Sequence, residues 1–135
     1  MVEACELSAL DARRQITDGT LTSEKLVQSC LRRIDMHSET VGAWSFMDPE
    51  LALLSAVKSD KAGNPGLLGG LPIGVKDIID TSSMPTTYGS SIYGLNQPKK
   101  DAKCVQNVKE HGGIVLGKTV TTEFAWRTPE KLKTQ

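Results

Sequence analysis

One lysine, Lys76, stands where it could act as a base. It lies in the segment Leu71-Pro-Ile-Gly-Val-Lys-Asp-Ile-Ile-Asp80, whose apolar and β-branched residues favour a strand. Side chains alternate along a strand, so Gly74 and Lys76 share one face, and the glycine leaves space beside the lysine stem. Burial in apolar surroundings lowers the pKa of a lysine, and a neutral amine can take a proton near pH 7. The alternative is an ordinary lysine at a strand end whose charged head reaches water.

The polar neighbours of Lys76 are interpreted as structural. Strand alternation points Asp77 away from Lys76, so we expect Asp77 to bind a turn or a nearby backbone amide. The pairs Ser82-Ser83 and Ser90-Ser91 lack the glycine-rich context that would expose a hydroxyl and supply N–H donors to an oxyanion. They are interpreted as turn residues. A catalytic serine is therefore not expected near Lys76 in the sequence.

The elements that would position Lys76 follow from caps and periodicity. Two helices are expected in the first forty residues, one starting at Ser8 and ending at Gly19, the next starting at Thr22 or Ser23. Short strands are expected over 43–47 and 114–117. A third helix should start at Asp48-Pro49 and a fourth at Asp101. The first helix carries the apolar residues Leu10, Ala12 and Ile16, and the third carries Leu51, Leu54 and Val57. The second helix should present an apolar face made of Val27, Cys30, Leu31 and Ile34, and Val105 and Val108 of the fourth should face inward.

Three segments, in their order and spacing, resemble the amidase signature family. They are Gly-Leu-Pro-Ile-Gly-Val-Lys-Asp77, Met84-Pro-Thr-Thr-Tyr-Gly-Ser90 and Gly117-Lys-Thr-Val-Thr-Thr-Glu-Phe-Ala125. The resemblance runs from about Leu7 to Thr128. It implies an α/β fold, namely the N-terminal part of the amidase-signature fold with a mixed sheet and flanking helices, here incomplete. We expect one partial domain over 1–135, with N-terminal helices over 1–40, a lysine-containing core segment over 66–128 and a tail over 129–135.

The resemblance also implies a chemistry. Family members hydrolyse non-peptide carboxylic amides with a Ser–cis-Ser–Lys triad, and Lys76 stands at the position of the general base. The lysine takes a proton from one serine, which relays it from the nucleophilic serine. Both serines lie in a later segment of the form GGSS-x-GS, which is absent from this sequence. We therefore expect an N-terminal amidase fragment that is inactive alone, and whose Lys76 is partly exposed to water and protonated.

Other interpretations stay open. The chain could be a non-catalytic interaction module, or a relic, that pairs with a C-terminal amidase half. It could also be part of the A subunit of a tRNA-dependent amidotransferase, although that branch usually has Asn-Met-Asp-Glu-Phe where this chain has Val-Thr-Thr-Glu-Phe124. An unrelated α/β domain is disfavoured by the joint order of the three segments.

The composition limits the kinds of partner that the chain is expected to bind. Sixteen basic and sixteen acidic residues cancel, which argues against nucleic-acid and membrane-surface binding. The sequence has no apolar run of ~18 residues. Its three cysteines are too far apart for a disulfide framework, so a cytoplasmic location is expected, with no cofactor and no metal. The expected partners are a small amide substrate in the intact enzyme, and either a C-terminal complementing chain or a second copy that covers an unpaired sheet edge.

Overall fold

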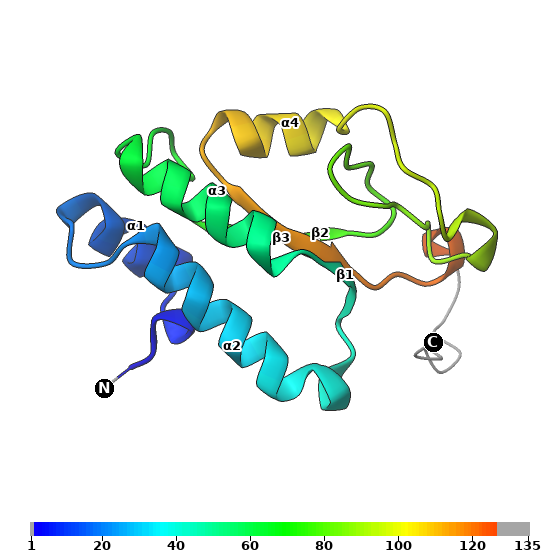
Figure 1. The fold of residues 1–135 in the computed structure, drawn as a ribbon, viewed down its shortest axis with the longest axis horizontal. Helices are drawn as coiled ribbons and strands as arrows, with labels where there is room; N and C mark the ends of the chain where they lie inside the picture. Colours follow the sequence, from blue (N-terminus) through cyan, green and yellow to red (C-terminus); the bar gives the residue numbers. More distant parts are fainter. Residues whose placement is uncertain (1, 127–135) are drawn as a thin grey trace.

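The computed structural model describes residues 2–126 as a small mixed sheet with helices on both faces (Figure 1). The expected sequence of helices and strands is confirmed, while the tail over 129–135 lies outside the described residues. The helices are α1 (Ala9–Asp18), α2 (Ser23–Val41), α3 (Pro49–Lys61) and α4 (Lys103–Glu110), and the strands are β1 (Trp44–Met47), β2 (Pro72–Lys76) and β3 (Ile114–Thr119). Short 3-10 turns are η1 (Ala4–Glu6), η2 (Ser91–Tyr93) and η3 (Glu123–Ala125).

Within residues 2–126, the last strand, β3, is the central strand of the sheet. The strand order is β1-β3-β2, with β3 antiparallel to β1 and parallel to β2. Lys76 is paired with Thr119, so β2 and β3 end side by side. The loops that leave these two strands, over 77–102 and 120–122, therefore start from the same end of the sheet. That end contains all three segments that resemble the amidase signature.

Most helix ends follow the expected capping chemistry. Ser8 accepts a hydrogen bond from the Asp11 N–H at 3.1 Å, and Thr22 accepts one from the Lys25 N–H at 3.2 Å. Asp48 caps α3 through the Leu51 N–H at 2.9 Å. One predicted cap is wrong, because α4 begins after Ala102, and its N-terminus receives no side-chain cap. The carboxylate expected there has other partners, which are described with the site.

Two of the apolar residues named for the helices are exposed, Leu10 on α1 and Leu54 on α3, the latter with a relative exposure of 68%. Instead, α3 buries Ala52 and Ala56, which share one face at a spacing of four residues. These small side chains pack against Val27 of α2 and against β3 in one cluster. Because α3 lies between α2 and the sheet, its closest contacts favour alanine over leucine.

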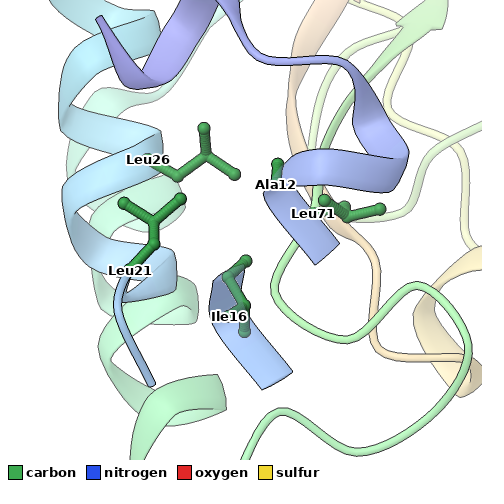
Figure 2. Packing of buried hydrophobic residues seen from close by; sticks show 5 residues of the cluster. All are labelled: Ala12, Ile16, Leu21, Leu26 and Leu71. Carbon is green, nitrogen blue, oxygen red and sulfur yellow. The ribbon is translucent and has the colours of Figure 1, made fainter. Parts of the chain in front are cut away.

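The core is divided among three groups of side chains. Where α1 meets α2 and the start of β2, five apolar residues pack together (Figure 2): Ala12, Ile16, Leu21, Leu26 and Leu71. The second group lies between α2, α3 and β3: Val27, Ala52, Ala56, Ile114 and Leu116. The third lies between the sheet, α4 and the loop after β2: Val75, Met84, Val105 and Val115. Alternate residues of β3 thus serve the two faces of the sheet.

No helix within residues 2–126 combines the length and apolar character needed to cross a membrane. Cys5, Cys30 and Cys104 are present as free thiols.

Candidate active site

Lys76 is the last residue of β2, and its side chain is exposed. Its neighbours Val75 and Asp77 are buried, as strand alternation requires when the lysine faces outward. The expected exposure of Lys76 is therefore confirmed. Its role as a base stays a prediction, because the described residues place no serine hydroxyl in hydrogen-bond contact with its amine.

The residue after the lysine is fixed by five polar contacts. The buried carboxylate of Asp77 accepts hydrogen bonds from the hydroxyl of Thr87 and from the Thr87 N–H, the latter at 3.2 Å. The backbone N–H of Asp77 donates to the Thr119 carbonyl at 2.9 Å, and its own carbonyl accepts from the Tyr88 N–H at 2.9 Å. The expected contact between Asp77 and a nearby backbone amide is confirmed. The fifth contact, an ion pair, was not expected.

That ion pair joins Asp77 to Lys118, whose Nζ lies 3.2 Å from Oδ1 of the aspartate. Lys118 belongs to β3, and its side chain is 0% exposed. The ammonium also donates to the Thr86 hydroxyl at 2.6 Å and to the Pro85 carbonyl at 3.2 Å. An ammonium has three N–H donors, so all three find acceptors. Desolvation lowers the pKa of Lys118, and the contact with Asp77 opposes this shift.

Burial in a strand thus applies to Lys118 rather than to Lys76. The predicted strand over 114–117 ended one residue before Lys118, whereas β3 continues to Thr119. A predicted strand two residues longer would have included Lys118, as β3 does. The signal for its partner is weaker, because Asp77 lies far from Lys118 in the sequence. Together the two residues tie the end of β2 to β3 and to the loop over 85–87.

One serine of each pair donates a hydrogen bond to a carboxylate of a distant segment. The hydroxyl of Ser90, which is buried, donates to Oε1 of Glu123 at 2.7 Å. The hydroxyl of Ser82 donates to Oδ1 of Asp101 at 3.0 Å, and the Ser82 N–H donates to the same oxygen at 2.6 Å. Within residues 2–126, neither hydroxyl has a hydrogen bond to the amine of Lys76, the base expected from the resemblance. The interpretation as turn residues is confirmed for Ser82 and Ser83, whereas Ser90 precedes the 3-10 turn η2 and Ser91 begins it.

Asp101 ties two loops to α4 instead of capping that helix. Besides Ser82, its carboxylate contacts Lys109 of α4, with 2.7 Å between Nζ and Oδ2. Burial acts to raise the pKa of Asp101, but the hydrogen bonds from Lys109 and Ser82 together outweigh it, and the pKa is lowered. The sequence therefore predicted correctly that Asp101 accepts hydrogen bonds, but the donors are Ser82 and Lys109 rather than the N–H groups at the start of α4.

We expect Asp101→Asn to lower the free energy of unfolding at neutral pH by roughly 1–2 kcal/mol, since it removes hydrogen bonds to a charged group. The folded-state pKa lies below 3.8, so the ionised carboxylate stabilises the fold above that pH. This contribution is lost as the pH falls below 3.8 through the folded-state pKa. Urea denaturation at neutral and at acid pH should show the difference between wild type and variant shrinking in acid. Asp35→Asn, at an exposed position on α2, is the matched control.

Another feature of this end of the molecule is aromatic. Tyr88, beside Asp77, donates its hydroxyl to Asp80 at 2.7 Å, and this hydrogen bond is the main cause of a raised pKa for Tyr88. The Phe124 N–H donates to the Tyr88 carbonyl at 2.7 Å. The loop after β2 and the segment after β3 are thereby joined next to Lys76.

Nowhere in residues 2–126 do three or more histidine, cysteine, aspartate or glutamate side chains gather as they would around a metal ion. The chemistry that these residues can offer is that of one exposed amine on a rigidly held backbone. The groups that hold it are the ion pair of Asp77 with Lys118 and the hydrogen bonds of the loop over 85–88.

Comparison with known proteins gives a consistent result. A family model described as Amidase matches residues 25–129. The chain is 32% identical over 129 residues to the A subunit of the glutamyl-tRNA(Gln) amidotransferase from Chloroflexus aurantiacus, covering 93% of this chain and 26% of that protein. The solved structure of native peptide amidase from Stenotrophomonas maltophilia superposes with a TM-score of 0.81 and 32% identity, over 88% of this chain and 26% of the other.

A third neighbour was solved as part of a protein complex. It is the inhibitor-bound form of a vestigial complex that reveals the evolutionary origins of an s-triazine catabolic enzyme, with a TM-score of 0.83 and 26% identity. The match covers 89% of this chain and 27% of that one. The chain thus spans about a quarter of the length of the relatives that it matches.

Proposed function

Because the chain belongs to the amidase family, we propose that it is the lysine-bearing portion of an enzyme that hydrolyses carboxylic amides. The observation that supports this most directly is the position of Lys76. It stands at the end of β2 within the matched residues, with its amine exposed and its backbone held by the contacts of Asp77. A base that must meet groups from elsewhere in the fold needs this combination of rigid support and open access.

In the proposed mechanism, Lys76 takes a proton from a bridging serine, which in turn takes the proton of a nucleophilic serine. The serine oxygen attacks the amide carbon, and the carbon–nitrogen bond breaks as the nitrogen is protonated and leaves as ammonia or an amine. Water then cleaves the acyl-serine ester, which releases the carboxylic acid and restores the serine. Neither serine is among the residues of this chain that resemble the family, so both would come from the remaining part of the fold.

Residues 1–135 would form one partial domain of that enzyme, since the match covers about a quarter of the length of its relatives. The reaction needs neither metal nor cofactor in this scheme. We propose the cytoplasm as its location, in keeping with the free thiols of the described part of the chain.

The test compares the chain alone with the chain joined to the missing part. The purified 135-residue chain should release ammonia from a panel of aliphatic and aromatic amides no faster than buffer. Co-refolding with a serine-bearing polypeptide, the roughly three quarters of the Stenotrophomonas peptide amidase that lie outside the matched region, should restore release. Ammonia release by the chain alone, abolished by Lys76→Ala, would contradict the proposal. A co-refolded complex without hydrolysis would also contradict it.

The amidotransferase similarity supports a second candidate, in which the amide is a nitrogen donor to an acceptor. The two candidates differ in their dependence on the acceptor. If adding glutamyl-tRNA increases ammonia release by the assembled enzyme, the amidotransferase role is favoured. If ammonia release does not change, a general amidase is favoured.

A further inference from the structure

Trp44, Thr119 and Lys76 stand in one row across the sheet. Thr119 of β3 is paired with Trp44 of β1 on one side and with Lys76 of β2 on the other. Paired residues of neighbouring strands point to the same face of a sheet, so the three side chains share one face. It is the face toward α2 and α3, because Trp44 packs against the apolar cluster that these helices form with β3. The expected base thus shares its face of the sheet with an indole two strands away.

Two glycines on this face make room for the indole of Trp44. A Cβ atom placed on Gly74 would lie 3.0 Å from Cη2 of Trp44 and 3.1 Å from Cγ2 of Thr119. A Cβ atom placed on Gly117 would lie 3.2 Å from Cε3 of the same indole. The ring therefore extends from β1 across β3 and reaches β2. It takes part of the space that Gly74 was expected to leave beside the stem of Lys76.

The backbone on either side of Trp44 is tied to β3 and the residue after it. The Val120 N–H donates to the Ala43 carbonyl at 2.9 Å. The hydroxyl of Ser45 donates to the Lys118 carbonyl at 3.2 Å. With its backbone fixed and its ring packed against the cluster between α2, α3 and β3, the indole has a defined position beside β2.

This arrangement limits where the side chain of Lys76 can lie. Gly74 precedes the lysine by two residues on the same face, so the tip of the indole lies toward the start of β2. Thr119 lies beside the lysine on β3. A stem that folded back over the sheet would meet the ring or the threonine, whereas the exposed amine is free to extend past the end of β2. A lysine stem has many rotamers, and confining it in advance lowers the entropic cost of bringing the amine to its partner.

We propose that Trp44 is a positioning residue for Lys76. Its indole blocks the side of the lysine that faces the start of β2 and directs the amine past the end of that strand, toward the hydroxyl that it is to deprotonate. This inference rests on the proposed function. In this role Trp44 acts through the lysine and not on the substrate, so its loss should change kcat and leave KM nearly unchanged.

The first measurement is made by NMR on the 135-residue chain alone. Nuclear Overhauser effects should connect the indole protons of Trp44 with the methylene protons of Lys76. Trp44→Leu removes the ring current, so the Lys76 methylene resonances should move toward those of Lys99, an exposed lysine in the loop before α4. Phe46→Leu is the matched control, because Phe46 packs on the opposite face of the sheet, and it should leave these resonances in place. Lys76 resonances that do not move in Trp44→Leu would overturn the proposal.

The second measurement uses the enzyme assembled from this chain and the serine-bearing polypeptide of the Stenotrophomonas peptide amidase. Trp44→Leu should lower kcat by roughly 10–10²-fold, the scale of a small misplacement of a reacting group, with KM within about twofold. Trp44→Phe keeps a ring over the glycines and should recover most of the rate, and Phe46→Leu should keep all of it. In a Lys76→Ala background, Trp44→Leu should have no further effect, because no stem is left to position. Equal losses of rate in both backgrounds would mean that Trp44 only supports the fold.

The outcomes separate the positioning role from the function. If the wild-type assembly releases no ammonia, the proposed function is contradicted, and the NMR resonances alone decide whether Trp44 confines Lys76. If the assembly hydrolyses amides and Trp44→Leu keeps full activity, the function stands and the positioning role is overturned. Circular dichroism melts establish that each variant is folded. Where Trp44→Leu does not fold, Gly74→Ala takes its place, because the added methyl group would displace the ring tip at 3.0 Å. Unchanged Lys76 resonances and kcat in Gly74→Ala would also overturn the proposal.

Discussion

Replacing Lys118 with methionine is expected to lower the free energy of unfolding by roughly 3–5 kcal/mol, because it leaves the buried carboxylate of Asp77 without its counter-ion. The two side chains are 0% and 2% exposed, so water cannot replace the lost ammonium. Methionine has a similar length and no charge, which separates the loss of charge from the loss of volume. Urea denaturation measures the change. A variant already unfolded without urea would show a loss at least as large as the stability of the wild type.

The control for this prediction is the same substitution at the exposed lysine. Lys76→Met should leave the urea midpoint essentially unchanged, since its side chain faces solvent. Adding Asp77→Asn to Lys118→Met should recover part of the loss, because the unpaired charge is then removed. If Lys118→Met and Lys76→Met were equally mild, or if the second substitution made the first worse, the ion pair would not be the element that holds the loop over 85–88.

The second large effect concerns activity. In the enzyme assembled from this chain and the serine-bearing polypeptide, Lys76→Ala is expected to lower the rate of amide hydrolysis by roughly 10²–10⁴-fold, the contribution typical of a positioned base. Lys76→Arg should be nearly as impaired, because a guanidinium stays protonated and cannot accept the proton. The measurement is kcat for ammonia release from one amide at saturating concentration.

Lys99→Ala tests whether loss of any exposed lysine has this effect. Lys99 is exposed in the loop before α4. This variant should keep full activity, and sedimentation should show that all three variants assemble equally well. Activity of Lys76→Ala within a factor of a few of the wild type would remove Lys76 from the catalytic groups, even if the complex hydrolysed amides.

The sequence predicted the parts of the fold that depend on local chemistry. Ser8, Thr22 and Asp48 cap the helices that they were expected to cap, because a side-chain acceptor serves N–H groups only a few residues away. The mixed sheet with flanking helices, the family and the exposure of Lys76 are likewise as expected. The family-defining segments coincide with the loops and strands that meet at one end of the sheet.

The errors arose where a partner from a distant segment decides the outcome. Asp101 lies one residue before the N-cap position, which Ala102 occupies, and its carboxylate accepts hydrogen bonds from Ser82 and Lys109 once the loop folds back. Leu54 has helical spacing with its neighbours, but α3 approaches α2 and the sheet through its alanines instead. The pair of Lys118 and Asp77 depends on two parallel strands lying side by side. No local pattern in either segment contains that information.

The place of β3 in the sheet has a consequence for how the chain folds. Both neighbours of β3 precede it in the sequence, and β1 and β2 do not pair with each other. During synthesis, the sheet therefore cannot form until Thr119 has left the ribosome, whereas α1 and α2 can form early. Pairings between such distant segments make folding slow, and the unpaired strands are open to association in the meantime.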